Sequence, residues 1–442
     1  MSAVQVAHDP GDPQLASAPV TGTPAGSRRW SGRLAGDTVW ATSVEALTLV
    51  SSLLVVYLIS TQLGPVDYGQ FVGAQALVAT LGMFSYASVG QLLLQGVVRD
   101  RAPADHVFAR CLVLLAGSTV VGLAIGFALR PVLFPQLTIT VFTLLAVAEL
   151  VGSGLVALGA SYLQALDDYR RSVVVRLLLM AARALAVLVL AVAGGLSLAA
   201  VAWSFSGLSA LAALAVLVDL RRHAQLRFSW RRPTGRDVRD TLSFAGALLS
   251  FSVHEDADKI LMVRLADPTT AGLYAAAYRA VQVALAPLKA LVAASHRRFL
   301  QHDPARRHEH VERSLRFTAA GAGYGLVAAV AVFLAAPLLP LVLGEEYAGS
   351  QEMVRLLAVL VVLRSLGVFS FNGLMGLRAH GARLTTVMSA AAVAAVLCVI
   401  GIAHWSWRGG VVATLVAECV FAAVSWTMLL VLQRRHDARL DG

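Results

Sequence analysis

The stretch Leu63–Phe71 reads LGPVDYGQF, and a reduced version of it, DPTTAGLY, recurs at Asp267–Tyr274. Both copies contain the pattern P-x-x-x-G-x-F/Y, and they lie at a constant offset of 203 residues. The shared positions are Pro65, Gly69 and Phe71 in the first copy and Pro268, Gly272 and Tyr274 in the second. Each copy follows one apolar run and opens another. A chain that repeats its apolar architecture at half its length is typical of a transporter built from two lobes.

The composition predicts a membrane protein. Of the 442 residues, 57% are hydrophobic and only 14% are charged, whereas a soluble domain carries about 25% charged residues. Apolar runs of about 20 residues, the length that crosses a bilayer, recur from end to end. We therefore expect an all-α polytopic membrane protein with twelve transmembrane helices in two six-helix lobes around a central cavity. The expected spans are 38–62, 71–97, 108–129, 137–165, 172–193, 196–218, 241–265, 271–295, 315–343, 350–377, 384–404 and 409–432.

The basic residues behind the formal net charge of +10 are distributed as a membrane topology requires. Arginines gather before the first span, after the last span and in every second loop, as the positive-inside rule expects of cytoplasmic segments. This alternation predicts an even number of spans with both termini in the cytoplasm. The basic excess is thus a topology signal, with anionic membrane lipids as a partner and no nucleic acid.

One long basic segment divides the chain near its middle, and the other loops are short. We expect five parts: a disordered cytoplasmic tail at 1–37, an N-lobe at 38–218, a cytoplasmic linker at 219–240, a C-lobe at 241–432 and a C-terminal tail at 433–442.

Ionisable residues inside the expected spans are the candidate functional residues. Each costs about 2.5–3.5 kcal/mol at the middle of a lipid-exposed helix, so they must pair, reach the interface or face water. Arg183, Arg279 and Arg364 lie deepest. Because the planar guanidinium binds two oxygens of a phosphate at once, we expect these three to line a central cavity and to contact a diphosphate.

Helical spacing groups several other residues. Arg176 and Arg183 are seven residues apart and share one helix face. Glu255 and Lys259 are four apart and can form an ion pair. Tyr274, Tyr278 and Gln282 form a four-spaced polar stripe.

The carboxylates Asp256, Asp258 and Glu45 are candidates for ion coupling, since burial and charged neighbours shift the ionisation of such groups. Two static alternatives stand beside these functional ones: Arg176 snorkels to the interface, and the charges around Lys259 form a structural network.

Motifs for soluble catalysis are absent from the sequence. It contains no G-x-x-x-x-G-K-S/T phosphate loop and no zinc-hydrolase spacing of histidines. We expect no cofactor, no metal, no catalytic residue and no enzymatic activity.

LGPVDYGQF resembles the signature that follows the first helix of polysaccharide flippases in the multidrug/oligosaccharidyl-lipid/polysaccharide (MOP) exporter superfamily. Its matching residues include Gly64, Pro65, Tyr68 and Gly69. Residues 258–282 are similar to the second-lobe segment of that family and residues 343–359 to its 9–10 hairpin. The likeness extends over 38–432, and one departure is Ala266-Asp267 where the family has Leu-Gly.

The resemblance implies a flippase. Such a protein moves a polyprenyl-diphosphate-linked oligosaccharide across the inner (cytoplasmic) membrane by alternating access, for cell-surface polysaccharide biosynthesis. Its expected partners are the lipid-linked oligosaccharide, membrane lipids, a glycan polymerase and glycosyltransferases. Two other functions remain open: a cation-coupled multidrug-type antiporter of the same superfamily, which needs an acidic cavity, and a membrane enzyme of glycan assembly, which needs a sizeable outer loop.

The charge alternation predicts that residues 232 and 346 lie on opposite sides of the membrane. In a chain whose native cysteines are replaced, Glu346→Cys should react with a membrane-impermeant maleimide on intact cells. Arg232→Cys should react only after the cells are permeabilised. Labelling of both positions from the same side would contradict the twelve-span topology.

Overall fold

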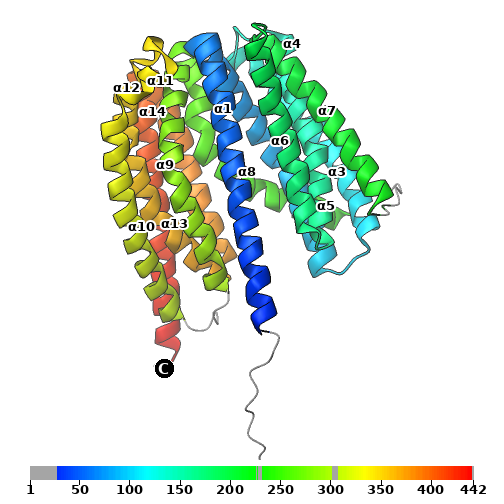
Figure 1. The fold of residues 1–442 in the computed structure, drawn as a ribbon. Coiled ribbons are helices and arrows are strands. Elements are labelled where there is room, and N and C mark those ends of the chain that lie inside the picture. Colours follow the sequence, from blue (N-terminus) through cyan, green and yellow to red (C-terminus); the bar gives the residue numbers. More distant parts are fainter. Residues whose placement is uncertain (1–26, 225, 227–230, 301–306, 441–442) are drawn as a thin grey trace, which may run out of the picture. The chain divides into compact units, whose positions relative to one another are not determined.

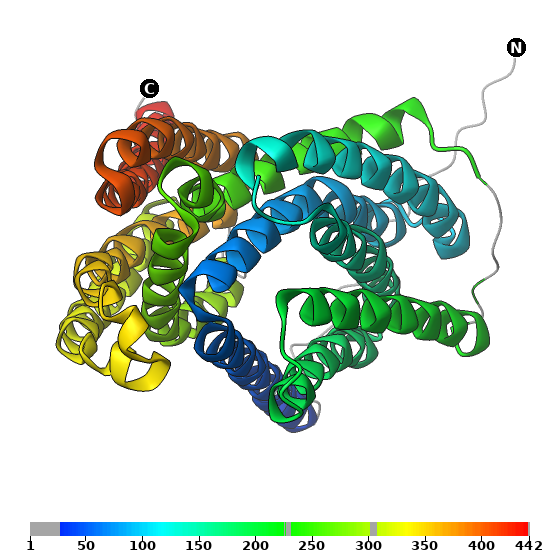
Figure 2. The same cartoon turned by 90° about the horizontal axis from the view of Figure 1, so that it is seen from above.

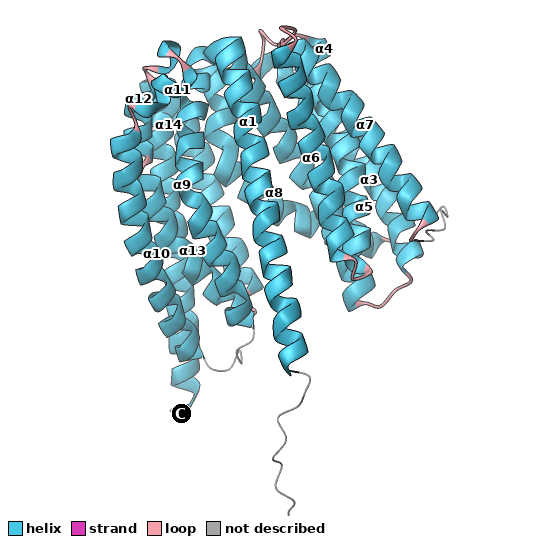
Figure 3. Ribbon diagram, viewed as in Figure 1, coloured by secondary structure: helices cyan, strands magenta, loops and turns pink. Residues whose placement is uncertain are grey.

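The computed structural model describes the backbone of residues 27–224, 226, 231–300 and 307–440. Within these ranges every element is a helix or a turn between helices, and no strand occurs (Figure 3). The chain divides into two compact units, residues 1–45 and 46–442. Residues 27–45 of the first unit are helical. The contacts and cavities described below all lie within the second unit.

The elements follow one another as eighteen helical segments in the described chain (Figure 1). They are α1 (Ser27–Gly82), η1 (Met83–Ala87), α2 (Ser88–Leu94), η2 (Gln95–Arg99), α3 (Ala104–Leu133), α4 (Ile139–Ala146), η3 (Val147–Ser153), α5 (Gly154–Ala165), α6 (Tyr169–Val192), α7 (Leu198–Arg222), α8 (Gly235–Leu265), α9 (Pro268–Leu300), α10 (Arg307–Ala335), α11 (Leu338–Leu343), η4 (Glu345–Tyr347), α12 (Ser350–Leu357), α13 (Val359–Gly376) and α14 (His380–Leu440).

The described helices are consistent with twelve membrane spans. Nine stretches are long and apolar enough to cross a bilayer, and the first and last of these, Leu47–Arg99 and His380–Arg434, exceed 50 residues. The first is broken at Gly64 and the last at Ser406, where the backbone leaves the helical region. The 31-residue α8 is not among the nine, because charged residues interrupt its apolar sequence. With these two breaks and α8, the helices follow the order of the expected spans.

The surface of the second unit is that of a multi-pass membrane protein. Large apolar side chains are exposed along α6, α10 and α11, with Val192 at 82%, Val327 at 71% and Leu341 at 75% of full exposure. Isolated exposed apolar residues are ordinary in soluble proteins, but long apolar helices that expose them in this number are covered by lipid.

The two motif copies begin helices in two different ways. Gly64 adopts φ 73°, a conformation that glycine takes without strain, and Pro65 opens the following helical stretch. Proline suits a first helical position, because its missing N–H has no partner there in any case. In the second copy Asp267 accepts hydrogen bonds from the backbone N and the hydroxyl of Thr270, at 2.8 and 2.6 Å. An aspartate cap therefore replaces the positive-φ glycine before Pro268.

The two copies of the motif pack directly on each other. A Cβ atom on Gly69 would collide with the backbone of Pro268 and Gly272, and one on Gly272 would collide with the backbone of Pro65. The two glycines thus allow the helices to cross at backbone contact. Beside this crossing the buried Tyr347 hydroxyl donates to the carbonyl oxygen of Ser60 at 3.0 Å. Burial raises the pKa of Tyr347, so that its phenol remains a donor.

Helix α8 connects the early and the late part of the chain. It packs along α14 and α9, and it also contacts η1, α2 and α3 (Figures 1 and 2). Polar contacts join α8 to the early helices near its start and near its middle. Arg110 of α3 pairs with Asp237 at 2.9 Å, and the hydroxyls of Thr80 and Ser252 lie 2.8 Å apart.

Several predicted boundaries shift in the structure. Helix α1 begins at Ser27, inside the tail predicted for 1–37, and α14 extends to Leu440, into the predicted tail 433–442. No proline follows Pro24 before Pro65, so the backbone hydrogen bonds continue without interruption. Residues 1–26 and 441–442 lie outside the described part, as do 225 and 227–230 of the predicted linker. The division into lobes at 38–218 and 241–432 stays a prediction.

The glycine crossing predicts that Gly69→Ala lowers the stability of the folded chain by about 1–3 kcal/mol, because backbone atoms cannot yield to the added methyl group. Gly207→Ala is the matched control, since a Cβ atom there meets no neighbouring atom. Thermal unfolding of the purified proteins in detergent measures the difference. Equal unfolding midpoints for the two variants would contradict the contact.

Candidate functional site

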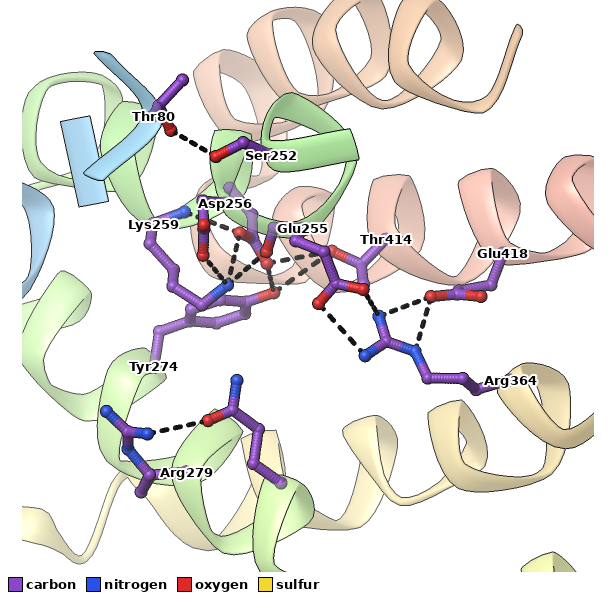
Figure 4. A network of polar contacts seen from close by, with 12 residues as sticks. Thr80, Ser252, Glu255, Asp256, Lys259, Tyr274, Arg279, Arg364, Thr414 and Glu418 are labelled. Atoms are coloured by element: carbon purple, nitrogen blue, oxygen red, sulfur yellow. Dashed lines mark hydrogen bonds and ion pairs between the residues drawn. The ribbon is translucent and has the colours of Figure 1, made fainter. Parts of the chain in front are cut away.

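The charged run HEDADK at His254–Lys259 lies within helix α8 and faces two neighbouring clusters. Successive helical residues point about 100° apart, so one short run supplies different surroundings. His254 and Glu255 face α13 and α14, whereas Asp256 and Lys259 border a cavity. The two clusters occupy adjacent parts of Figure 4.

The first cluster is centred on Arg364 of α13. Its guanidinium bonds the carboxylate of Glu255 at 2.9 Å and that of Glu418 at 2.6 Å. In Figure 4 the Arg364 side chain reaches between the two carboxylates. The three side chains are 13%, 23% and 3% exposed, in the order Arg364, Glu255, Glu418. One cation joins helices α8, α13 and α14, because each unpaired charge would be costly at this depth.

His254 completes this cluster. Its Nε2 lies 3.4 Å from Glu418 Oε1, and its ring stacks on Phe421 with 5.6 Å between centroids. Its buried Nδ1 has no hydrogen-bond partner among the described residues. His254, Glu255 and Glu418 offer ligand atoms within 4.8 Å of one another, as a metal site would. The Arg364 guanidinium, however, already bonds both carboxylates and supplies the positive charge.

The second cluster surrounds Lys259. Its ammonium bonds Asp256 at 3.1 Å and Asp258 at 3.3 Å, and lies 3.8 Å from the centroid of the Tyr278 ring. The ion pair expected between Glu255 and Lys259 does not form through the carboxylate. Lys259 contacts the backbone carbonyl of Glu255 instead, because that carboxylate is turned toward Arg364.

Asp258 is saturated with donors. Its carboxylate accepts from the Tyr274 hydroxyl at 2.6 Å and from Thr414 at 3.1 Å, in addition to the backbone N of Lys259 at 2.8 Å. The side chain is 4% exposed. Tyr274, a position of the repeated motif, thereby connects the start of α9 to α8 and α14.

A cavity of about 400 Å³, the cationic cavity, lies beside this second cluster. Its lining comes from α1, α6, α7, α8 and α9. Three cationic side chains, Arg183, Lys259 and Arg279, line it together with one carboxylate, Asp256. Gln75, Tyr278 and Gln282 add neutral polar groups. The volume falls within the range of small-molecule sites, and the charge excess suits an anion.

Several polar atoms at this cavity lack a protein partner. Within the described residues, Gln75 Oε1, Tyr278 OH and Arg183 Nε are buried without a hydrogen bond. Arg279 bonds the side chain of Gln282 at 3.0 Å, and no ion pair to it is formed in the described part of the chain. Because buried polar groups are nearly always satisfied by protein, water or ligand, these groups are available to a polar ligand.

Arg183 is held by several protein groups around its guanidinium. It pairs with Glu149 at 3.4 Å, donates to Ser153 at 2.9 Å and to Ser209 at 2.5 Å. Its guanidinium carbon lies 5.0 Å from the centroid of Phe205. These contacts fix the guanidinium in one orientation at the cavity wall.

The structure separates the predicted site residues. Arg183, Arg279 and Asp256 line the cationic cavity, whereas Arg364 and Asp258 are not among its lining residues. Glu45 lies in α1, but its side chain is outside the described part. The diphosphate and coupling roles of these residues stay predictions. Sequence reasoning did not assign Lys259 and Gln75 to this wall. For α9, the four-residue spacing of Tyr278 and Gln282 was the sequence signal that these side chains share one polar face.

Comparisons with known proteins agree with this architecture. The profile of the family described as polysaccharide biosynthesis protein matches residues 59–352. No curated protein sequence matches the chain. An inward-facing multidrug resistance MATE family transporter of the MOP superfamily is 17% identical, with a TM-score of 0.67 over 90% of this chain and 99% of that one.

Two further solved structures share the fold. An outward-facing multidrug resistance MATE family transporter is 17% identical, with a TM-score of 0.61 over 90% of this chain and 96% of that one. A MOP superfamily transporter from Pyrococcus furiosus, whose binding pocket is described as of reverse polarity, is 16% identical. It has a TM-score of 0.57 over 88% of this chain and 94% of that one. At these identities the likeness establishes the fold alone.

The Arg364 cluster predicts a large structural cost for Glu418→Gln. The amide replaces a buried carboxylate that accepts from Arg364 and lies beside His254, and hydrogen bonds to charged groups contribute about 1.5–3 kcal/mol. Glu255 still pairs with Arg364 in this variant. Glu352→Gln is the control, because its pair with Arg408 at 2.9 Å is 55–64% exposed and exposed pairs contribute about 0–1 kcal/mol. Thermal unfolding in detergent compares the two. Similar midpoints would show that the cluster contributes little to stability.

Proposed function

This chain belongs to the polysaccharide biosynthesis protein family and has the fold of MOP-superfamily transporters, and from this premise we propose that it is a flippase for a polyprenyl-diphosphate-linked oligosaccharide. The proposed transport runs from the inner to the outer leaflet of the cytoplasmic membrane by alternating access. The proposal includes cytoplasmic termini, on the side where the arginine-rich loops are expected to lie. Glycosyltransferases that complete the substrate and a polymerase that consumes it are the proposed partners.

The charge of the cationic cavity carries this proposal. Three cationic side chains line it against one carboxylate. Arg183 pairs with Glu149, and Lys259 pairs with Asp256 and Asp258. Arg279 forms no ion pair in the described residues and bonds the neutral Gln282 amide, so its charge is open to a diphosphate. Arg183 and Arg279 line the cavity from α6 and α9, so a diphosphate could be bound by two different helices. Charge-assisted bonds of this kind are stronger than neutral ones.

Arg364 enters the proposal as a positioning residue. It bonds Glu255 and Glu418 and offsets one of their two negative charges. Within a low-dielectric environment those charges would repel an anionic substrate over several ångströms. A pairing outside the cavity wall thus reduces the negative charge that an anionic substrate would meet.

The multidrug-type antiporter is the second candidate. Its cationic substrates require an acidic cavity, and the only carboxylate that lines the cationic cavity in the described residues, Asp256, is already bonded by Lys259. The charge balance thus favours the anionic substrate. A membrane enzyme of glycan assembly has no comparable observation in its favour.

The glycine crossing suits a gate for alternating access. Gly69 and Gly272 bring two helices into backbone contact on the side that the charge pattern assigns to the exterior. We propose that this contact closes the cavity toward the exterior and separates when the substrate leaves. The repeated motif then supplies both halves of one gate.

The proposal predicts that Arg279→Gln weakens binding of inorganic pyrophosphate, a soluble probe for the diphosphate, by about tenfold or more. Titration calorimetry on the purified chain measures this affinity. Flipping of a fluorescent polyprenyl-diphosphate oligosaccharide in proteoliposomes should fall in parallel. Arg279→Lys should retain part of both, since it keeps the charge and loses the fork.

Two controls frame this experiment. Arg408→Gln removes an exposed charge remote from the cavity and should bind pyrophosphate like the wild type. Asp256→Asn removes the cavity carboxylate and should bind it more tightly. The proposal fails if the wild type does not bind pyrophosphate, or if Arg279→Gln binds it as well as Arg408→Gln does. Flipping by Asp256→Asn under an imposed pH gradient tests coupling at this carboxylate, and a response equal to that of the wild type removes the assignment.

A further inference from the structure

A second cavity of about 400 Å³ lies against the same helix α6. We call it the amide cavity; its lining comes from η1, α2, η3, α5 and α6. Arg176 and Leu179 line it on α6, and Met180 and Arg183 line the cationic cavity. These four positions fall on one helix face at spacings of three, four and seven residues. The two cavities therefore follow one another along α6.

The chemistry of the amide cavity differs from that of its neighbour. Arg176 is the one charged residue among its lining side chains in the described chain. The other polar groups are neutral: the amides of Gln91 and Gln164, and the hydroxyls of Tyr86, Ser153 and Ser161. Amides and hydroxyls that both donate and accept match the hydroxyl groups of a sugar. An apolar ligand chain would bury these polar groups without hydrogen bonds, which is unfavourable.

Arg176 faces this cavity without a counter-ion. Within the described residues its guanidinium forms no ion pair and no hydrogen bond, and the same holds for the amides of Gln91 and Gln164. Arg183, one face position further along, is by contrast held by Glu149 and two serines. Arg176 and Gln91 are exposed and Gln164 is half-buried, so these groups are open to a ligand in the cavity. The guanidinium can pair with an anionic group that such a ligand carries.

The two cavities share a polar partition. Tyr86, in the wall of the amide cavity, donates to Glu149 at 2.9 Å, and Glu149 pairs with Arg183 in the wall of the cationic cavity. Ser153, which also lines the amide cavity, accepts from Arg183 at 2.9 Å. The walls of the two cavities are thus joined by one network of polar contacts.

We propose that the amide cavity is the glycan subsite of the transporter and that it selects a sugar residue bearing a carboxylate, such as a uronic acid. Arg176 binds the carboxylate through its planar fork, and Gln91 and Gln164 bind the neighbouring hydroxyls. The inference rests on the proposed function, because the diphosphate in the cationic cavity delivers the attached sugar to the partition. A neutral glycan offers no counter-charge to the exposed Arg176, and the ion pair that only an acidic glycan can form is the source of the selectivity.

The test compares two soluble probes that differ only in charge. Cellobiouronic acid carries a carboxylate where cellobiose carries a hydroxymethyl group. Binding to the purified full-length chain in nanodiscs is measured by titration calorimetry or saturation-transfer NMR. The wild type should bind the acidic disaccharide about tenfold more tightly than the neutral one. Arg176→Gln should lose this preference, and Arg176→Lys should retain part of it.

Further variants separate recognition from folding. Gln91→Leu should weaken both disaccharides to a similar degree, because the amide contacts hydroxyls that the two share. Arg408→Gln should keep the full preference, and the unfolding midpoint of each variant shows that the chain is folded. The inference is overturned if the wild type shows no preference, or if the preference survives in Arg176→Gln. A wild type that binds pyrophosphate but shows no preference overturns the glycan subsite alone, and the proposed diphosphate site stands.

Discussion

The pairing of charges at membrane depth is the constraint on which this structure depends. Helix α8 carries five ionisable residues in the six positions from His254 to Lys259, and alone it would be an unfavourable membrane helix. Arg364 on α13, Glu418 on α14 and Tyr274 on α9 supply the partners. The packing of the late helices around α8 is thus required by the electrostatics of one helix, since each pair satisfies charges that lipid cannot solvate.

The same pairing determines the character of the cavities. Arg364 offsets part of the charge of Glu255 and Glu418, and Asp258 is saturated by donors. Three of the four charged side chains that line the cationic cavity are positive. The fold shared with multidrug transporters therefore does not determine the sign of the substrate, as is general for folds that host many functions. The sign of the substrate's charge depends instead on a few carboxylates and on the cation with which each one pairs.

The boundary between α1 and α9 combines a close helix contact at one level with an open cavity at another. At Gly69 and Gly272 the helices touch through their backbones, whereas further along α1 and α9 the side chains of Gln75, Tyr278 and Arg279 border the cavity. Small residues permit the approach at one level, and long polar residues keep the helices apart at another. A gate and a binding site can therefore lie on the same pair of helices.

The sequence by itself determined the helical membrane class, the order of the spans and the motif at Gly64–Phe71, because hydropathy, arginine placement and glycine or proline positions act locally along the chain. It also identified Arg183, Arg279 and Asp256 as residues that needed partners or water. Only the tertiary structure decided which partner each charge received. Four-residue spacing favoured Glu255 with Lys259, yet Arg364, more than one hundred residues away in sequence, binds Glu255 instead. Helical periodicity describes neighbours within one helix, whereas the partner of a buried charge is set by which other helix packs against it.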